Sequence, residues 1–202
     1  MQICRFGEWN TIANFHPMSS DHRPETRFIV TRDDRGILVC FTVADRYVRA
    51  VAQGRPKVDA YLDSCVEFFF KPRGERTYVN IEMTIAGAAH ISHVRDWRRL
   101  PKGGLADAVF VESSDIVIET DHKGPIDPEI AEPVNWRASA FVPYGFMRRV
   151  WGDGCNMGEF LCNFYKCADN SSHPHWGSWA PIDEKLNFHR PECFGLLSGG
   201  QS

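Results

Sequence analysis

The chain has 202 residues, of which 43% are hydrophobic and 24% charged, and its formal net charge is −3 at pH 7. These proportions are typical of a soluble globular domain and exclude a wholly disordered chain. The charge offers no basic surface for nucleic acid or an anionic membrane, and no apolar run reaches the roughly 18 residues of a membrane span. The first residues lack the basic and apolar regions of a signal peptide, so we expect the chain as given to be cytoplasmic, or extracytoplasmic if a leader has been removed.

The seven cysteines are an odd number, so they cannot all pair with one another. Most lie in apolar runs, and we expect them to be buried free thiols that pack as small hydrophobic residues. Cys162 and Cys167 are five positions apart and would point to opposite faces of a strand, which disfavours a shared metal ion. We therefore assign the cysteines no part in the chemistry.

Two hairpins are predicted in the first half of the chain. Segments 28–31 and 37–43 flank a turn that ends at Gly36, and segments 65–70 and 78–83 flank a turn at 71–74. Further strands are predicted over 115–120, 135–142 and 160–166, and helix is limited to a short segment at 101–108 or 143–150. The pattern predicts an all-β protein, an antiparallel, jelly-roll-like β-sandwich with long loops.

The stretch 121–134 is the most linker-like part of the chain, since it is rich in polar residues, Pro and Gly. The predicted strands on its two sides have the same character. We therefore interpret it as a long loop and predict that residues 1–202 form a single domain.

Four polar residues interrupt the predicted strands. Glu67 lies between two apolar residues, Asn80 and Glu82 share one face of the next strand, and Asn163 lies in an apolar run. If these strands are neighbours, the four side chains share one face of a sheet. Carboxylates and amides are suited to binding the hydroxyl groups of a sugar. The alternative is that all four simply face solvent.

Aromatic and histidine residues gather in the segments 171–181 and 187–195, which Pro and Gly interrupt. Rings in loops commonly bind sugars by packing against their C–H faces, although such rings can equally pin a long loop onto a sandwich. His173 and His175 are spaced to bind a metal on an extended segment, but the sequence identifies no third ligand.

The order of six short motifs resembles that of the family 9 carbohydrate-binding modules, and especially of stand-alone bacterial proteins similar to them. The motifs are SCVEFFF (64–70), YVNIE (78–82), WRASAFVPY (136–144), NFYK (163–166), SWAP (178–181) and FHRPECFG (188–195). The resemblance covers roughly residues 25–197, and it implies a β-sandwich that binds a mono- or oligosaccharide without catalysis. In xylanase-linked members the ligand is the reducing end of a sugar chain, clamped between two Trp rings.

By motif, the resemblance implies clamp rings at Tyr61 and Phe188, a carboxylate at Glu67, and hydroxyl-binding amides at Asn80 and Asn163. Tyr and Phe stand where the family has Trp, and they offer less stacking area. The family's Arg on the second of these strands corresponds to Asn80.

Two further residues, Trp179 and Lys166, are expected beside this site. The sequence does not determine which sugar binds or the oligomeric state.

Three alternatives remain open. Related sandwiches hold haem between a Met and a His or Lys, and this chain offers eight His and the residues Met83, Met147, Met157 and Lys166. A glycosidase could use Glu67 and Glu82 as its two carboxyl groups. The resemblance also leaves structural calcium open. Oxygen ligands near turns are then available at Asp33, Asp34, Asp45 and Asp63, without the spacing of a calcium-binding loop.

Overall fold

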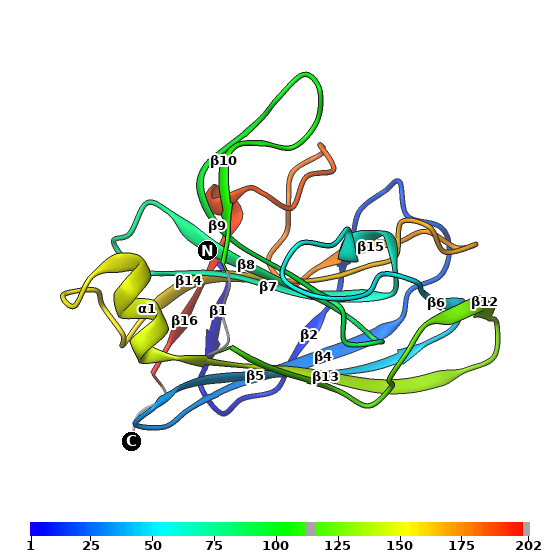
Figure 1. Cartoon of the computed structure of the whole chain (residues 1–202), viewed down its shortest axis with the longest axis horizontal. Helices are drawn as coiled ribbons and strands as arrows, with labels where there is room; N and C mark the ends of the chain where they lie inside the picture. The colour runs from blue at the N-terminus through cyan, green and yellow to red at the C-terminus, as the bar shows by residue number, and fades with distance from the viewer. Residues whose placement is uncertain (112–115, 200–202) are drawn as a thin grey trace.

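Two β-sheets pack face to face in the computed structural model, which describes residues 1–111 and 116–199 (Figure 1). The large sheet contains β1 (Ile3–Arg5), β3 (Asn14–Phe15), β7 (Cys65–Pro72), β8 (Tyr78–Thr84), β9 (Ala89–Arg99), β10 (Leu105–Phe110), β14 (Phe160–Cys167), β15 (Trp176–Ser178) and β16 (Gly195–Ser198). The small sheet contains β2 (Asn10–Ile12), β4 (Glu25–Arg32), β5 (Gly36–Asp45), β11 (Val117–Thr120) and β13 (Val134–Pro143). A separate two-stranded ribbon consists of β6 (Val48–Ala50) and β12 (Ile126–Ile130).

Strand pairing is antiparallel except between β1 and β16, as far as the described residues show. The large sheet has the order β1-β16-β14-β7-β8-β9-β10, with β15 pairing β14 and β3 pairing β15. The small sheet has the order β11-β13-β5-β4-β2. The prediction of an antiparallel β-sandwich is therefore confirmed.

The core lies between the two sheets because alternate residues of each strand point inward. Phe28 on β4 stacks on Phe164 on β14, with ring centroids 3.6 Å apart and an interplanar angle of 16°. The inner face of β14 also carries Cys162, whereas Tyr165 and Cys167 lie on its outer face. The prediction that Cys162 and Cys167 point to opposite faces is confirmed.

Helical structure in the described residues consists of α1 (Tyr144–Trp151) and the two short 3-10 helices η1 (Ala60–Leu62) and η2 (Pro191–Cys193). Helix α1 matches the predicted helix at 143–150. No helix in this part of the chain has the length and apolar character needed to cross a membrane.

The alternative helix predicted at 101–108 is wrong. Gly103 and Gly104 adopt φ of +89° and +78°, a left-handed conformation that favours glycine, and they form the turn between β9 and β10. The other predicted strands are present, with β11 covering residues 117–120 of the predicted 115–120. Position 115 of that prediction lies outside the described residues.

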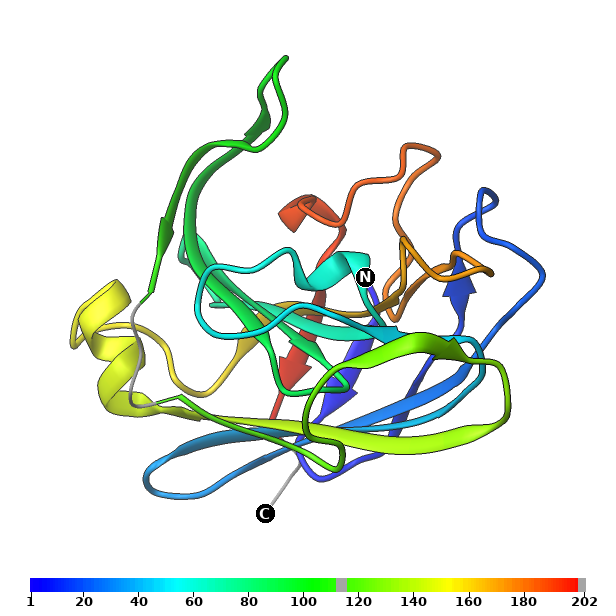
Figure 2. The same ribbon diagram turned by 45° about the vertical axis from the view of Figure 1, so that its right-hand side comes forward.

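Three segments rise above the outer face of the large sheet, as Figures 1 and 2 show. They are the β9–β10 hairpin, the loop that carries η1, and the C-terminal loop that ends in η2 and leads into β16. The sheet supplies a rigid floor and the three segments supply walls. This arrangement makes the outer face of the large sheet the place to look for a site.

Candidate functional site

A cleft of about 570 Å³ opens on the outer face of the large sheet. Side chains of β7, β8, β9 and β14 form its floor, and the three raised segments form its walls. Its lining includes Asp59, Tyr61, Glu67, Phe69, Glu82, His90, Ser92, Arg99, Phe110, Cys167, Asp169, Trp176, Asn187, Phe188 and His189. A volume of this size falls in the range typical of small-molecule sites.

The floor is built by the register of four neighbouring strands. Glu67 on β7 lies opposite Tyr165 on β14 and opposite Glu82 on β8, which in turn lies opposite His90 on β9. Because side chains alternate along each strand, this row of polar groups faces the cleft while Val66 faces the core. The pairing explains why polar residues interrupt otherwise apolar strands.

Buried carboxyl groups distinguish this floor from an ordinary polar surface. Glu67 and Glu82 are almost completely removed from solvent, and burial raises the pKa of both carboxyl groups. Cys167 Sγ donates to Glu67 Oε1 at 3.0 Å, and Asn80 Nδ2 donates to Glu82 Oε1 at 2.8 Å. Glu82 Oε2 has no hydrogen-bond partner and is therefore available to a ligand.

Aromatic rings form much of the walls. Tyr61 on η1 is 42% exposed, and Phe110 on β10 is 39% exposed. Phe188 stacks on Tyr165 with centroids 4.1 Å apart, so one face of its ring is covered by protein. Trp176 is fixed by a hydrogen bond of 2.7 Å from Nε1 to Asp169 Oδ1. Rings held in this way lose little entropy when a ligand packs on them.

Two cationic or basic groups complete the lining. Arg99, exposed at the end of β9, donates through Nε and Nη2 to Oδ1 of Asn187 at 3.3 and 3.1 Å. This bridge joins the β9–β10 hairpin to the C-terminal loop. The Tyr78 hydroxyl and His189 Nδ1 form a hydrogen bond of 2.7 Å, and burial lowers the pKa of His189 to about 3. The imidazole is therefore neutral at physiological pH.

The structure brings together three of the residues predicted for the site, since Tyr61, Glu67 and Phe188 all line the cleft. Asn80 lies on the same sheet face, where it contacts Glu82 and accepts a hydrogen bond from Ser92 Oγ. It supports the floor without being among the lining residues.

Asn163 has a different environment from the one expected. Its Nδ2 donates to the carbonyl of Ala180 at 3.0 Å, and its Oδ1 accepts the N–H groups of Phe164 and Ala180, both at 2.9 Å. The side chain is completely buried, and its hydrogen bonds hold the segment after β15 against β14. The expected hydroxyl-binding role is therefore corrected to a structural one.

Trp179 and Lys166 are also not neighbours of the cleft. The Trp179 ring lies in the core, where it packs edge-on against Phe28 and Phe164, and a methyl group at Gly195 would overlap it. Lys166 occupies the inner face of β14, because it is one residue away from the outward-facing Tyr165. Both expectations are corrected, because Trp179 packs into the core directly after β15 and Lys166 points inward from β14.

Several lining residues were not predicted from the sequence, including His90, Arg99 and Phe110. Strand β9 was not predicted, although Ile91 alternates with His90 and Ser92 in the manner of a half-buried strand. That alternation could have revealed His90. Arg99 and Phe110 enter the cleft only because the β9–β10 hairpin rises from the sheet.

Three of the four acidic residues considered for calcium already have hydrogen-bond or ion-pair partners. Asp33 accepts hydrogen bonds from Arg35, and Asp63 accepts the backbone N–H groups of Val51 and Ala52 at 2.8 and 2.7 Å. Asp45 is paired with the ammonium of Lys166. These oxygens already face donors, and calcium requires several free oxygens converging on one point.

The methionines considered as haem ligands do not line the cleft. Met83 and Met147 are completely buried in the hydrophobic core, and Lys166 is engaged by Asp45. Neither Met83, Met147 nor Met157 lines the cleft. These three methionines and Lys166 are therefore not placed to ligate a haem in the cleft.

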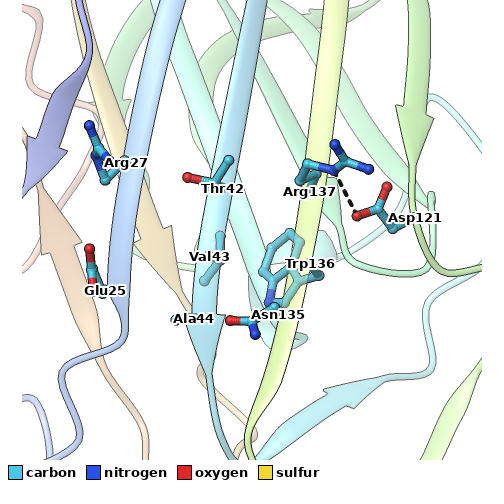
Figure 3. A pocket seen from close by; sticks show the side chains of 9 residues that line it. All are labelled: Glu25, Arg27, Thr42, Val43, Ala44, Asp121, Asn135, Trp136 and Arg137. Atoms are coloured by element: carbon cyan, nitrogen blue, oxygen red, sulfur yellow. Dashed lines mark hydrogen bonds and ion pairs between the residues drawn. The ribbon is translucent and has the colours of Figure 1, made fainter.

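A second hollow of about 330 Å³ lies on the outer face of the small sheet (Figure 3). Its surroundings are polar and include the ion pair between Arg137 and Asp121, with Nε and Oδ2 3.0 Å apart. The aromatic residue among its lining side chains, Trp136, is only 2% exposed. This hollow offers no ring on which a sugar could stack.

Comparison with known protein families agrees with the geometry of the large cleft. The model of the carbohydrate-binding family 9 matches residues 5–198. The chain belongs to this family. Comparison with curated proteins found no match.

Solved structures with the family 9 fold are similar to this chain. A candidate carbohydrate-binding protein from Bacteroides uniformis is 28% identical, with a TM-score of 0.80, and the match covers 96% of this chain and 86% of that one. A family 9 module from Caldicellulosiruptor kristjanssonii, in complex with glucose, is 14% identical with a TM-score of 0.62, covering 100% and 97%. The same kind of module in complex with cellotriose is 14% identical with a TM-score of 0.61, covering 99% and 94%.

Proposed function

We propose that the cleft on the large sheet binds a saccharide without catalysis, with one sugar ring packed between Tyr61 and Phe188. The observation that carries this proposal is the combination of exposed rings with buried, incompletely paired carboxyl groups in one cleft. Sugars have apolar C–H faces and polar edges, so they need both kinds of group at once. Membership of a carbohydrate-binding family supports the same function.

Glu67, Glu82 and Arg99 are the groups proposed to contact the sugar hydroxyls. Burial raises the pKa of both carboxyl groups, and their oxygens can accept hydrogen bonds from sugar hydroxyls. Arg99 adds donors from the opposite wall, at the mouth of the cleft. Because the free sugar is well hydrated, we expect a dissociation constant on the order of micromolar or weaker.

The proposed ligand class is a glucose-type sugar or a short oligosaccharide, bound through a terminal ring. The relatives in complex with glucose and cellotriose have the same fold, and this supports the choice of β-linked glucose oligomers as first ligands. Tyr61 and Phe188 offer less ring surface than the Trp pair implied by the family resemblance. We therefore expect weaker binding than in members with a Trp clamp.

Isothermal titration calorimetry tests the proposal. Glucose, cellobiose, cellotriose and xylobiose should be titrated into the full chain and into the Tyr61→Ala variant. Binding of at least one sugar, weakened about tenfold or more by Tyr61→Ala, is the expected result. Trp9→Ala is the matched control, since Trp9 is an exposed ring that does not line the cleft. Absence of heat with the whole panel, or equal affinities for wild type and Tyr61→Ala, contradicts the proposal.

Hydrolysis by the pair Glu67 and Glu82 is the alternative to binding alone. A glycosidase needs one carboxyl group to act as an acid and the other to be ionised, so their pKa values must move apart. Here burial raises the pKa of both carboxyl groups, so the directions alone single out neither as the ionised partner. Assays with aryl glycosides test this, and turnover that is lost in Glu82→Gln would support an enzyme instead.

A further inference from the structure

Two thiols and a carboxyl group converge at the floor of the cleft. Cys65 on β7 lies directly opposite Cys167 on β14, and Glu67 follows Cys65 two positions later on the same face. The two sulfur atoms and a Glu67 carboxylate oxygen all lie within 4.8 Å of one another. In the described part of the chain, this is the group of three His, Cys, Asp or Glu side chains close enough to hold a metal ion.

The donor set indicates which ion would fit. Thiolate sulfur binds Zn²⁺ at about 2.3 Å and carboxylate oxygen at about 2.0–2.2 Å, so tetrahedral ligand atoms lie roughly 3.3–3.8 Å apart. The observed spacing needs only small side-chain movements to reach that geometry. Calcium and magnesium prefer oxygen ligands alone, so two sulfur donors select a softer ion such as Zn²⁺.

The site is buried but has a route to solvent. All three side chains are 2% exposed or less, which protects metal–sulfur bonds from competing water. Glu67 and Cys167 nevertheless line the cleft, whereas Cys65 lies behind them. Three protein ligands with one side facing a cleft correspond to a zinc site that keeps its fourth position open.

A second observation points to the same place. Glu82 lies opposite Glu67 on the neighbouring strand, is 95% buried, and has an Oε2 atom with no hydrogen-bond partner. A buried acceptor without a donor is costly unless a ligand supplies one. Water on the open position of a zinc ion would supply that donor, in the manner of the outer-shell carboxylates of zinc sites.

We propose that this chain binds one Zn²⁺ ion through the sulfur atoms of Cys65 and Cys167 and the carboxylate of Glu67. When the ion binds, the two S–H protons and any proton on the Glu67 carboxyl leave to solvent. The hydrated ion gives up water molecules, two Zn–S bonds and one Zn–O bond form, and no electron is transferred. The proposal does not rest on sugar binding. It also gives Cys65 and Cys167 a role beyond packing, which was all that the sequence predicted for the cysteines.

Cobalt titration of the reduced full chain tests the site. In the presence of a phosphine reductant, Co²⁺ should produce a thiolate-to-metal absorption band that saturates at one equivalent and disappears on addition of Zn²⁺. Cys65→Ser and Cys167→Ser should each weaken binding at least 100-fold. Cys40→Ser is the control, since Cys40 is a partly exposed thiol on the small sheet, outside the cluster.

Substitutions at buried cysteines can impair folding, so a measurement on wild type must accompany them. X-ray absorption spectroscopy of the zinc-loaded chain should show two sulfur ligands, with oxygen completing the coordination. The proposal is overturned by a missing cobalt band, by a band in either variant as strong and as tightly bound as in wild type, or by a sulfur count other than two. Mass spectrometry that finds a Cys65–Cys167 disulfide persisting under reductant also overturns it, because a disulfide cannot ligate zinc in this way.

Discussion

The ammonium nitrogen of Lys166 lies 3.1 Å from Oδ2 of Asp45, and neither side chain is exposed to solvent. Two histidines complete the group. His22 donates through Nε2 to the other oxygen of Asp45 at 2.8 Å, and Lys166 donates to Nε2 of His175 at 2.8 Å. This network links the inner face of β14 to the end of β5. It therefore joins the large sheet, which carries the cleft, to the small one.

Lys166→Met should destabilise the protein strongly. The substitution leaves the Asp45 carboxylate buried beside a neutral side chain, and breaking a buried pair in this way typically costs about 3–5 kcal/mol of unfolding free energy. Urea unfolding at pH 7 measures the change. The double variant Asp45→Asn/Lys166→Met should recover at least half of the loss, because no charge then remains unpaired. Equal stabilities of the single and double variants would contradict this account.

The buried imidazole of His189 predicts a loss of stability in mild acid. Its pKa is lowered to about 3 in the folded chain, chiefly by burial, whereas an unfolded histidine titrates near pH 6.5. Between about pH 6.5 and pH 3, the histidine is protonated in the unfolded state but remains neutral in the folded state. Stability from His189 is therefore complete above about pH 6.5 and declines toward pH 3, by about 1.4 kcal/mol per pH unit.

The pH dependence of wild type and His189→Gln separates this contribution from others. Denaturant unfolding between pH 7 and pH 4 should show a shallower decline for His189→Gln than for wild type. His122→Gln is the control, since His122 is partly exposed and lies outside the cleft. If the unfolding free energies of wild type and His189→Gln decline equally with falling pH, the contribution assigned to His189 is refuted.

Asn163→Ala should lower stability without changing sugar affinity. The substitution leaves the buried N–H groups of Phe164 and Ala180 and the carbonyl of Ala180 without the amide that pairs with them. Each unsatisfied buried group costs about 1–3 kcal/mol, so we expect a total of about 3 kcal/mol or more. Thermal unfolding measures the loss, and calorimetry should give an affinity within about twofold of wild type at a temperature where the variant is folded.

Asn156→Ala is the comparison for this experiment. Its Oδ1 accepts the N–H of Gly158 at 2.8 Å in an exposed turn, where water can replace it. A much smaller loss of stability is expected there. If Asn163→Ala unfolds at the wild-type temperature but binds sugar tenfold more weakly, the residue contacts the ligand after all.

Arg99→Met should weaken saccharide binding and leave stability nearly unchanged. Arg99 is exposed, so the folded chain loses little when the guanidinium is removed, whereas a sugar hydroxyl at the cleft mouth loses charged donors. A reduction in affinity of about fivefold to fiftyfold is expected by calorimetry. Arg95→Met is the matched control, because Arg95 lies on the same hairpin but pairs with Asp107 at 2.8 Å. If Arg99→Met and Arg95→Met change the sugar affinity equally, Arg99 is not part of the proposed site.

The sequence alone determined the class of fold and the faces of the strands. Alternation of side chains is a local property with a period of two residues. It therefore assigns Phe68 to the core and Glu67 to the opposite face wherever the strand lies. The composition and motif order were likewise sufficient to indicate a sandwich of family 9 type, and two residues that the motifs single out, Tyr61 and Phe188, line the cleft.

Only the tertiary structure decided which polar groups meet. Lys166 alternates like any strand residue, but its partner Asp45 belongs to the other sheet, and no local pattern joins them. From its strand position alone, Asn163 resembles a ligand-binding amide. In the structure its side chain is instead hydrogen-bonded to Ala180, in the segment after β15. Arg99 reaches the cleft because a glycine turn carries a hairpin above the sheet. Contacts of this kind depend on pairing between distant segments, which the packing of the whole chain settles.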